Sequence, residues 1–352
     1  MTWRDRIREF VAAGLLIIGV GSGAVLATGA TSDATLIRIG AFNIQVFGQT
    51  KAGNDAIMDV LARTAREFDV LLVQEVRDAK QEVAGRFLER INRDITTPYA
   101  MIEGPRLGRT NSKEQYVFYY RPSVVTFVDS FTVQDVSDVW EREPLVARFR
   151  AGTFDFRLIG IHIKPDQVRN ELAELAELAD SVRTASESDV IMLGDFNADC
   201  SYLNEADNSI PLRQARFHWV IGNGVETAVK SGCTYDRMIM FDGTFADEYE
   251  PNSAQVLRYD QEFGITDQDF IERVSDHYPI YAEFRINRPD DDGTGAAPAT
   301  TAAPFVGSRL GHTYYKAGCS GARGLSPANI VEFSSAQDAE AQGYHRSQSA
   351  GC

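Results

Sequence analysis

Short apolar runs that end in polar side chains are the feature that most constrains how this chain can fold. The runs cover residues 36–42, 70–73, 116–120, 154–163, 190–193, 235–241 and 278–284, and their length and β-branched content are typical of strands. Two longer segments, 55–66 and 171–182, repeat apolar residues at helical spacing, with acids on the opposite face of the second. Strands outnumber helices, and several strands are apolar on one side only. The pattern favours an α+β fold of packed sheets with outer helices over a parallel doubly wound sheet.

Changes of composition divide the chain into four parts. Residues 289–304 are rich in Pro, Gly, Ala and Thr and lack hydrophobic periodicity, which is typical of a linker. This linker separates a body, 34–288, from a small tail, 305–352. Residues 1–30 begin with three arginines, continue with an apolar stretch and end in small residues. They predict a secretory signal peptide, with a retained membrane anchor through residues 10–30 as the alternative.

The formal net charge of the 352-residue chain is −15. An acidic surface repels phosphate, so affinity for nucleic acid cannot come from bulk electrostatics. If the substrate is a phosphodiester, divalent cations and a few local arginines must overcome that repulsion. The charge therefore favours an enzyme that releases its product over a tight nucleic-acid binder.

The cysteines form two groups, one in the body and one in the tail. The candidate bonds are Cys200 with Cys233 and Cys319 with Cys352. An exported chain favours disulfides over free thiols. Four cysteines permit three connectivities, and the separation into two segments favours this one.

Six of the predicted strands begin or end with residue types suited to metal binding and acid–base chemistry. These residues are Asn43, Glu75, His162, Asp195 with Asn197, Asp236, and Asp276 with His277. Taken singly, an acid at a strand end is more often a turn residue or a helix cap. Taken together, carboxylate and amide oxygens can hold a hard cation against the charge of a phosphodiester. The two imidazoles can move protons, and Asp236 and Glu114 are the candidates to orient them.

Six motifs, in order and over almost the entire body, resemble those of deoxyribonuclease I. They are IGAFNIQVFGQTK, DVLLVQEVRD, LGRTNSKEQYVFYYRP, MLGDFNADCSY, TYDRMIM and SDHYPIYAEF. GDFN and SDH alone would indicate only the endonuclease/exonuclease/phosphatase superfamily. The RDAKQ and LGRxxxKE contexts narrow the likeness to the deoxyribonuclease branch. The resemblance implies a four-layered α/β/β/α sandwich, in which two packed mixed sheets are flanked by helices.

The roles that the resemblance implies fall into three groups. The metal and phosphate site would consist of Glu75, as principal ligand of Mg²⁺ or Mn²⁺, with Asn43, Asp195, Asn197 and Asp276. The acid–base pair with its orienting carboxylates would be His162 with Glu114 and His277 with Asp236. The DNA contacts would be Arg77 in the minor groove, and Arg109 and Arg142 near phosphates. Which histidine protonates the leaving oxygen is left open.

The same resemblance bears on disulfides and on calcium. A Cys200–Cys233 bond matches a disulfide position of the family, whereas the family's second small disulfide loop is missing. The acids that could still hold a structural Ca²⁺ near that missing loop are Asp135, Asp138 and Glu143. Ser112 stands where the family places a tyrosine against the sugar in the minor groove, which weakens any expected preference for B-form duplex.

The tail resembles a small module related to the metal-binding domain of the Ada methylation-repair protein. Tyr315 stands near an expected histidine of that module, and Ser347 near an expected cysteine. The remaining Cys319 and Cys352 favour a stapling disulfide, since a zinc site would need His312 and His345 as further ligands.

The sequence leaves three candidate functions. The first is a secreted, metal-dependent DNA endonuclease that acts as a monomer without a stable protein partner, with transient membrane contact only through the N-terminal segment. The second is a phospholipid phosphodiesterase similar to sphingomyelinases, although the exposed aromatic hairpins typical of those enzymes are absent from the sequence pattern. The third is a non-enzymatic surface-binding protein, which the complete set of matched catalytic positions disfavours.

Overall fold

The computed structural model describes residues 35–135, 137–183, 189–288, 305–308, 313–316, 330–333, 336–341 and 343–347. The predicted signal peptide or anchor and the predicted linker lie outside the described residues, as does the predicted Cys319–Cys352 bond. Among the helices that are described, none combines the length and the apolar character needed to cross a membrane.

The first sheet of the body has the strand order β11–β12–β1–β2–β4–β3. Its strands are β1 (Leu36–Phe47), β2 (Val70–Val76), β3 (Ala100–Glu103), β4 (Gln115–Tyr120), β11 (Gln255–Val256) and β12 (Ile280–Arg285). Only the central pair, β1 and β2, is parallel. The crossover between these two strands carries the helices α1 (Gln49–Ala52) and α2 (Asp55–Ala65).

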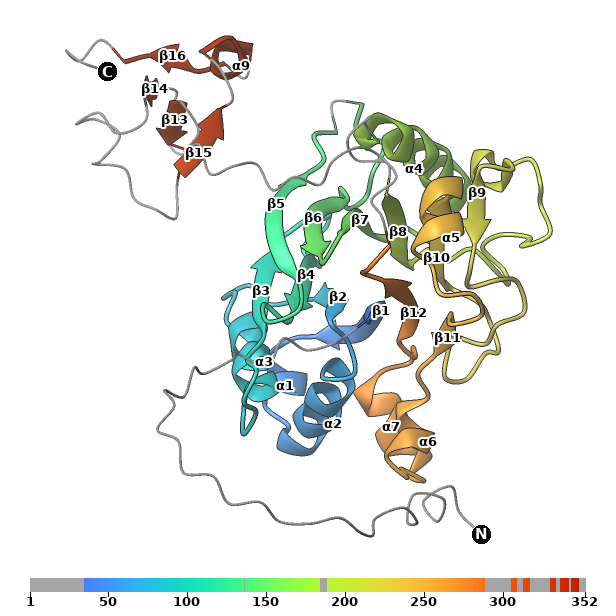
Figure 1. The fold of residues 1–352 in the computed structure, drawn as a ribbon. Helices are drawn as coiled ribbons and strands as arrows, with labels where there is room; N and C mark the ends of the chain where they lie inside the picture. The colour runs from blue at the N-terminus through green and yellow to red at the C-terminus, as the bar shows by residue number, and fades with distance from the viewer. Residues whose placement is uncertain are drawn as a thin grey trace, which may run out of the picture. The chain divides into compact units, whose positions relative to one another are not determined.

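The second sheet repeats this plan with the order β5–β6–β7–β8–β10–β9. Its strands are β5 (Thr126–Thr132), β6 (Leu145–Ala151), β7 (Phe154–His162), β8 (Val190–Asp195), β9 (Phe217–Trp219) and β10 (Asp236–Phe241). Again only one pair is parallel, β7 with β8, and its crossover carries α4 (Val168–Val182). Each sheet is therefore mixed, with a parallel pair among antiparallel neighbours (Figure 1).

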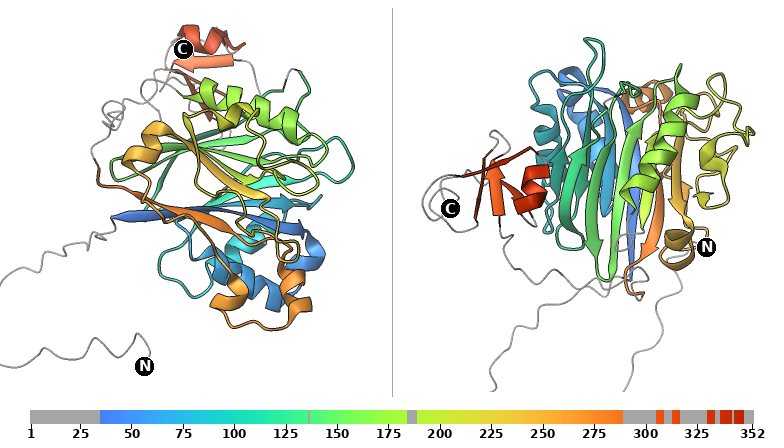
Figure 2. Two further views of the ribbon diagram at one scale, coloured as in Figure 1. Left: turned by 90° about the vertical axis from the view of Figure 1, so that its right-hand side faces the viewer. Right: turned by 90° about the horizontal axis from the view of Figure 1, so that it is seen from above.

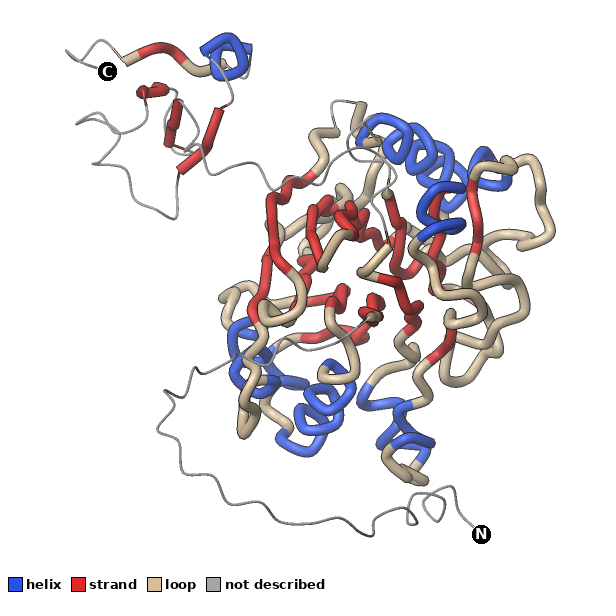
Figure 3. Tube along the Cα trace, in the orientation of Figure 1, coloured by secondary structure: helices blue, strands red, loops and turns tan. Residues whose placement is uncertain are grey.

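The body has four layers, two packed sheets with helices on their outer faces, which confirms the α/β/β/α sandwich (Figures 2 and 3). Three apolar clusters lie between these layers. One cluster fills the space between the sheets, with Leu72, Phe118, Leu158 and Met238 among its members. A second lies between the first sheet and its outer helices, α2, α3 (Val83–Ile91), α6 (Tyr259–Glu262) and α7 (Gln268–Val274). A third lies between the second sheet and α4. Sheets covered on both faces explain why β8 and β10 are buried along their whole length.

The two predicted helices form where the sequence places them, with one correction. The side chain of Asn54 accepts a hydrogen bond from the backbone N–H of Ile57 and so caps α2. In α4, Leu172 and Leu175 are buried as predicted, but Glu171 is fully buried too. Its carboxylate accepts hydrogen bonds from the backbone N–H groups of Glu141 and Lys164, so this acid does not share the outer face.

The described part of the tail is a four-stranded sheet in the order β15–β13–β14–β16. The strands are β13 (Phe305–Ser308), β14 (Thr313–Lys316), β15 (Ile330–Phe333) and β16 (His345–Arg346), and α9 (Ala336–Ala341) follows β15. Tyr314, Phe333 and Ala339 form a small core. His345, one of the candidate zinc ligands, is exposed, and His312 lies outside the described residues.

Candidate active site

The candidate residues meet because each sheet has one parallel pair, and the carboxyl ends of parallel strands lie at the same edge. In the first sheet Asn43 of β1 is in register with Gln74 of β2, directly before Glu75. In the second sheet His162 of β7 is in register with Asp195 of β8. The antiparallel neighbours start at this edge: Asp236 opens β10 opposite Asp195. Likewise, Asp276 and His277 lie a few residues before β12, which pairs with β1.

Polar bonds join the two sheets across this edge. The Asn43 amide donates through Nδ2 to Asp195 Oδ2 at 3.0 Å and to Glu75 Oε1 at 3.2 Å. Gln74 accepts a hydrogen bond from the backbone N–H of Asp195 and donates to the carbonyl of Ile161. Because Asn43, Gln74 and Asp195 are buried, the bonds fix the separation of the two parallel pairs.

Strained backbone marks two of the candidate ligands. Glu75 has φ 59° and Asn197 has φ 49°, both in the left-handed region that non-glycine residues rarely adopt. At Glu75 the strain accompanies a register shift in the pairing of β2 with both β1 and β4. Such conformations persist where surrounding contacts hold them, and they cluster at functional sites.

His162 lies in a buried cage of polar groups. Its Nδ1 is 2.9 Å from Glu114 Oε2, and its Nε2 is 3.4 Å from Asp195 Oδ2. Burial and the neighbouring Arg142 lower the pKa of the imidazole, but Glu114 and Asp195 outweigh them and raise it. Burial opposes ionisation of Glu114, yet His162 and the two nearby arginines bring the pKa of that carboxyl down to about 2.

His277 forms the matching pair on the other side. Its Nδ1 is 2.7 Å from Asp236 Oδ2, and its Nε2 is 3.7 Å from the same Oδ2 of Asp195. Burial alone would lower the pKa of His277, but Asp236 and Asp195 raise it to about 10. Asp195 therefore lies between the free Nε2 atoms of the two imidazoles, each of which is held from behind by a carboxylate.

The donor set fits a hard divalent cation. Since Asn43 donates through its nitrogen to Glu75 and Asp195, its buried Oδ1 points away from both, and that atom has no hydrogen-bond partner among the described residues. Two groups of potential ligands converge here, Glu75 with Glu114 and His162, and Asp195 with Asp236 and His277. Carboxylate and amide oxygens are the ligands that Mg²⁺, Mn²⁺ and Ca²⁺ prefer.

The three predicted DNA-contact arginines differ in what they touch. Arg77 Nη2 is 2.9 Å from Glu75 Oε2 and 2.7 Å from Glu114 Oε1, so it bridges the two carboxylates. Arg142 is buried and donates from Nε and Nη2 to the carbonyl of His162. Arg109 is exposed and pairs with Asp138. Arg142 thus supports the backbone of His162 from behind.

The Cys200–Cys233 disulfide is present. Next to it, the backbone N–H of Thr234 donates to Asp199 Oδ2 at 2.7 Å, so the loop after β8 is tied to the chain that enters β10.

The candidate calcium ligands do not converge in the described part of their loop. Asp135 accepts from the backbone N–H of Trp140, and Asp138 pairs with Arg109. No cluster of three acidic ligand atoms among the described residues includes Asp135, Asp138 or Glu143.

Sequence reasoning missed several polar residues that support the site. Gln45 donates to Asp276 Oδ2 at 2.8 Å, and the hydroxyl of Tyr116 accepts from the backbone N–H of His162. Ser275 donates to the carbonyl of Asn43 and accepts from the N–H of His277.

Lys51 is a further supporting residue. Its ammonium donates to the carbonyls of Gln45 and Val274. Burial lowers the pKa of Lys51 to about 8, although Asp276 and Glu75 oppose the shift. Most of these supporting residues lie inside or beside the quoted motifs, but their residue types alone do not indicate a supporting role.

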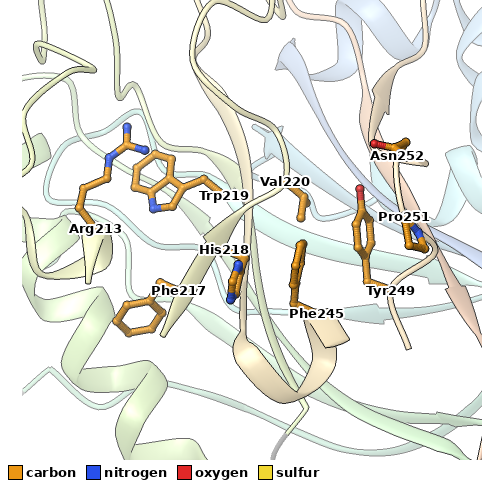
Figure 4. Close-up of a pocket in the computed structure, with 9 residues that line it drawn as sticks. All are labelled: Arg213, Phe217, His218, Trp219, Val220, Phe245, Tyr249, Pro251 and Asn252. Atoms are coloured by element: carbon orange, nitrogen blue, oxygen red, sulfur yellow. The ribbon is translucent and has the colours of Figure 1, made fainter. Parts of the chain in front are cut away.

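A separate aromatic pocket of about 500 Å³ lies at the other end of β10 (Figure 4). Phe245, on α5 (Asp242–Asp247), stacks between His218 and Tyr249, and Arg213 lies over the ring of Trp219. β9, which carries His218, pairs with the last residues of β10, whereas Asp236 is its first. None of the predicted site residues lines this pocket.

Comparisons with known proteins agree with the fold and the motifs. Residues 40–318 match the Endonuclease/Exonuclease/phosphatase family. Deoxyribonuclease-1 of Equus caballus is 34% identical over 272 residues, which cover 74% of this chain and 96% of that protein. Deoxyribonuclease-1-like 2 of Mus musculus is 36% identical, over 72% of this chain and 94% of its own length.

Among solved structures, D. rerio TDP2 complexed with single strand DNA product superimposes with a TM-score of 0.50. It covers 72% of this chain and all of its own, at 16% identity, which supports the fold alone. The family match and the two relatives go further, because they cover most of the body that carries the polar strand ends. The chain belongs to the endonuclease/exonuclease/phosphatase family, among the relatives of deoxyribonuclease I.

Proposed function

We propose that this protein is an exported, divalent-metal-dependent endonuclease that hydrolyses phosphodiester bonds of DNA. The observation that carries the proposal is the pair of imidazoles that face one carboxylate, Asp195, from opposite sides at 3.4 and 3.7 Å. A tetrahedral phosphate at this position would meet a proton-transfer group toward the attacking water and another toward the leaving oxygen.

Glu75 is the principal ligand of the cation in this proposal, and Asn43, Asp195, Asn197 and Asp276 complete the metal and phosphate site. A bound Mg²⁺ or Mn²⁺ would neutralise charge on the non-bridging oxygens of the phosphate. Arg77 bridges Glu75 and Glu114 and so places a positive charge beside the same oxygens.

The histidines act as the acid–base pair, each positioned by a carboxylate. Glu114 and Asp236 accept hydrogen bonds from the Nδ1 atoms of His162 and His277, which leaves Nε2 of each ring directed at the reaction centre. One Nε2 takes the proton of the attacking water, and the other gives a proton to the leaving 3′ or 5′ oxygen. The Arg142 bonds to the His162 carbonyl hold the backbone that carries this ring.

DNA is favoured over a phospholipid because the described surface has no apolar hairpin that could enter a membrane. Its exposed large apolar side chains, on separate segments, are Val46, Phe131, Tyr202 and Phe245. The proposed export is supported by the N-terminal pattern and by the Cys200–Cys233 bond, since disulfides persist in oxidising compartments.

The test is a substrate panel. The full chain is incubated with Mg²⁺ and either supercoiled plasmid or sphingomyelin vesicles, with EDTA and His277→Ala as the two controls. We expect nicking of the plasmid that EDTA abolishes and that His277→Ala slows by roughly 10²–10⁴-fold, with the lipid untouched. Lipid hydrolysis without nicking would contradict the assignment of DNA. No hydrolysis of either substrate, with Mg²⁺ or Mn²⁺, would contradict the proposed activity itself.

A further inference from the structure

Val46 has an apolar side chain that does not belong to the hydrophobic core of the described residues. It is 53% exposed, the highest value among the exposed large apolar residues of the described chain. Its φ is 48°, in the left-handed region where the Cβ of an L-residue crowds the following carbonyl oxygen and a β-branched residue is a genuine outlier. An exposed valine gains little from burial that could offset this strain, so its side chain requires another explanation.

A bulge in β1 places the backbone of Val46 beside the candidate metal ligand Glu75. Asn43 pairs with Gln74 and Phe47 pairs with Val76, so β1 has three residues where β2 has only Glu75. Of these three, Ile44 is buried, Gln45 is half-buried and Val46 is exposed, as expected for a segment that arches out of the sheet. The backbone N–H of Val46 donates to Glu75 Oε2 at 2.8 Å, which fixes the valine relative to the candidate ligand.

The valine also lines the cavity that leads away from this site. The cavity measures about 830 Å³, and it shares Gln45 and Asp276 with the candidate active site. Its charged lining residues are balanced, with Lys51, Lys230 and Arg273 against Asp269, Glu272 and Asp276. A nucleic-acid strand bound at the metal site can therefore continue into a space where Val46 offers an isopropyl group to its sugars.

We propose that Val46 is a substrate-contacting residue that packs against the sugar of the nucleotide next to the scissile phosphate. The inference rests on the proposed nuclease function and names the part of the substrate that this side chain recognises. An apolar contact of this kind excludes water from the sugar and positions the phosphate over Glu75. It also accounts for the strain, because the side chain stabilises the bound substrate and not the free fold.

Val46→Gly tests the proposal because it removes the isopropyl group and the strain but keeps the N–H that Glu75 accepts. We expect its melting temperature to rise, since glycine adopts positive φ freely. We expect kcat/KM for DNA with Mg²⁺ to fall roughly tenfold, the scale of a lost isopropyl contact. Hydrolysis of bis(4-nitrophenyl) phosphate, a diester without a sugar, stays unchanged.

Asp94→Gly is the matched control, because Asp94 is also exposed and left-handed, with φ 59°, but lies in the loop between α3 and β3. This variant should hydrolyse both substrates at the wild-type rate. Equal DNA cleavage by Val46→Gly and wild type would overturn the inference and leave the nuclease intact. An equal loss on both substrates would overturn it too, because the valine would then act through Glu75. If the wild-type protein cleaves neither substrate, both the proposed function and this inference are contradicted.

Discussion

At the residue scale, the two histidines of the candidate site differ in their neighbours. Arg142 lies beside His162 and lowers the pKa of its imidazole, whereas the carboxylates of Asp236, Asp195 and Asp276 raise the pKa of His277. Both rings are buried, so the charge on each depends on the carboxylate at its Nδ1. Removing one of these carboxylates should therefore shift the pKa of the histidine that it contacts and leave the fold intact.

Asp236→Asn should lower the pKa of His277. In the metal-free protein the wild-type pKa is raised to about 10, so the imidazolium is fully present below the ordinary value of 6.5 and is lost only as pH rises through about 10. Without the Asp236 carboxylate, burial still lowers the pKa of His277 and only Asp195 and Asp276 still raise it, so the titration moves down from about 10. NMR titration of the imidazole measures this shift. Asp242→Asn is the control, because Asp242 pairs with His218, and an unchanged His277 titration in Asp236→Asn would contradict the assigned partner.

At the scale of elements, strand-end reasoning predicted which residues meet but not how the backbone presents them. The apolar runs predicted strands that end near Asn43, Glu75, His162 and Asp195. They did not predict that β1 with β2 and β7 with β8 are parallel, which is what brings these residues to one edge. The arch from Ile44 to Val46 could not be read from the sequence. It depends on a register shift between two strands that are separated by a helical crossover.

The contacts of the arginines could not be predicted either, for a related reason. The motif gives Arg77 and Arg142 a place near the site, but long side chains select their partners in three dimensions. Arg77 pairs with Glu75 and Glu114, and Arg142 with a backbone carbonyl of β7. Likewise, the periodicity of α4 does not predict that Glu171 is buried. Its burial depends on hydrogen bonds from two backbone N–H groups of other segments.

Glu171→Gln should stabilise the protein at alkaline pH. Burial raises the pKa of Glu171 from 4.5 to about 7, so the folded state binds more protons than the unfolded state between these values. The free energy of unfolding therefore falls as pH rises from 4.5 to 7, and the loss persists above 7. Between pH 4 and pH 8, the stability of Glu171→Gln relative to wild type should rise by about 3 kcal/mol.

Urea denaturation of both proteins at pH 4, 6 and 8 measures this difference. Glu177→Gln serves as the control, since Glu177 lies on the same helix but is exposed. A constant difference between Glu171→Gln and wild type at all three pH values would show that the buried carboxyl does not titrate in this range.

At the scale of the whole molecule, the candidate site lies where the edges of two sheets with the same plan come together. Each sheet contributes one parallel pair, so Asn43 and Glu75 come from one and His162 and Asp195 from the other. The net charge of −15 surrounds this site with a field that repels DNA. In the proposed function, catalysis would therefore depend on local cations, both a metal ion held by Glu75 and arginines such as Arg77, and loss of the metal site should be decisive.

The most direct measurement is the rate of plasmid nicking as a function of Mg²⁺ concentration, for the wild type and for Glu75→Gln. Glutamine keeps the size of the side chain and removes the charge that would hold the cation. We predict that wild-type nicking rises with Mg²⁺ and saturates. Glu75→Gln should be slower by at least about a hundredfold at equal Mg²⁺, as expected when several kcal/mol of metal-ion stabilisation are lost. Equal Mg²⁺ dependence and equal rates in the two proteins would contradict a metal-dependent nuclease centred on Glu75.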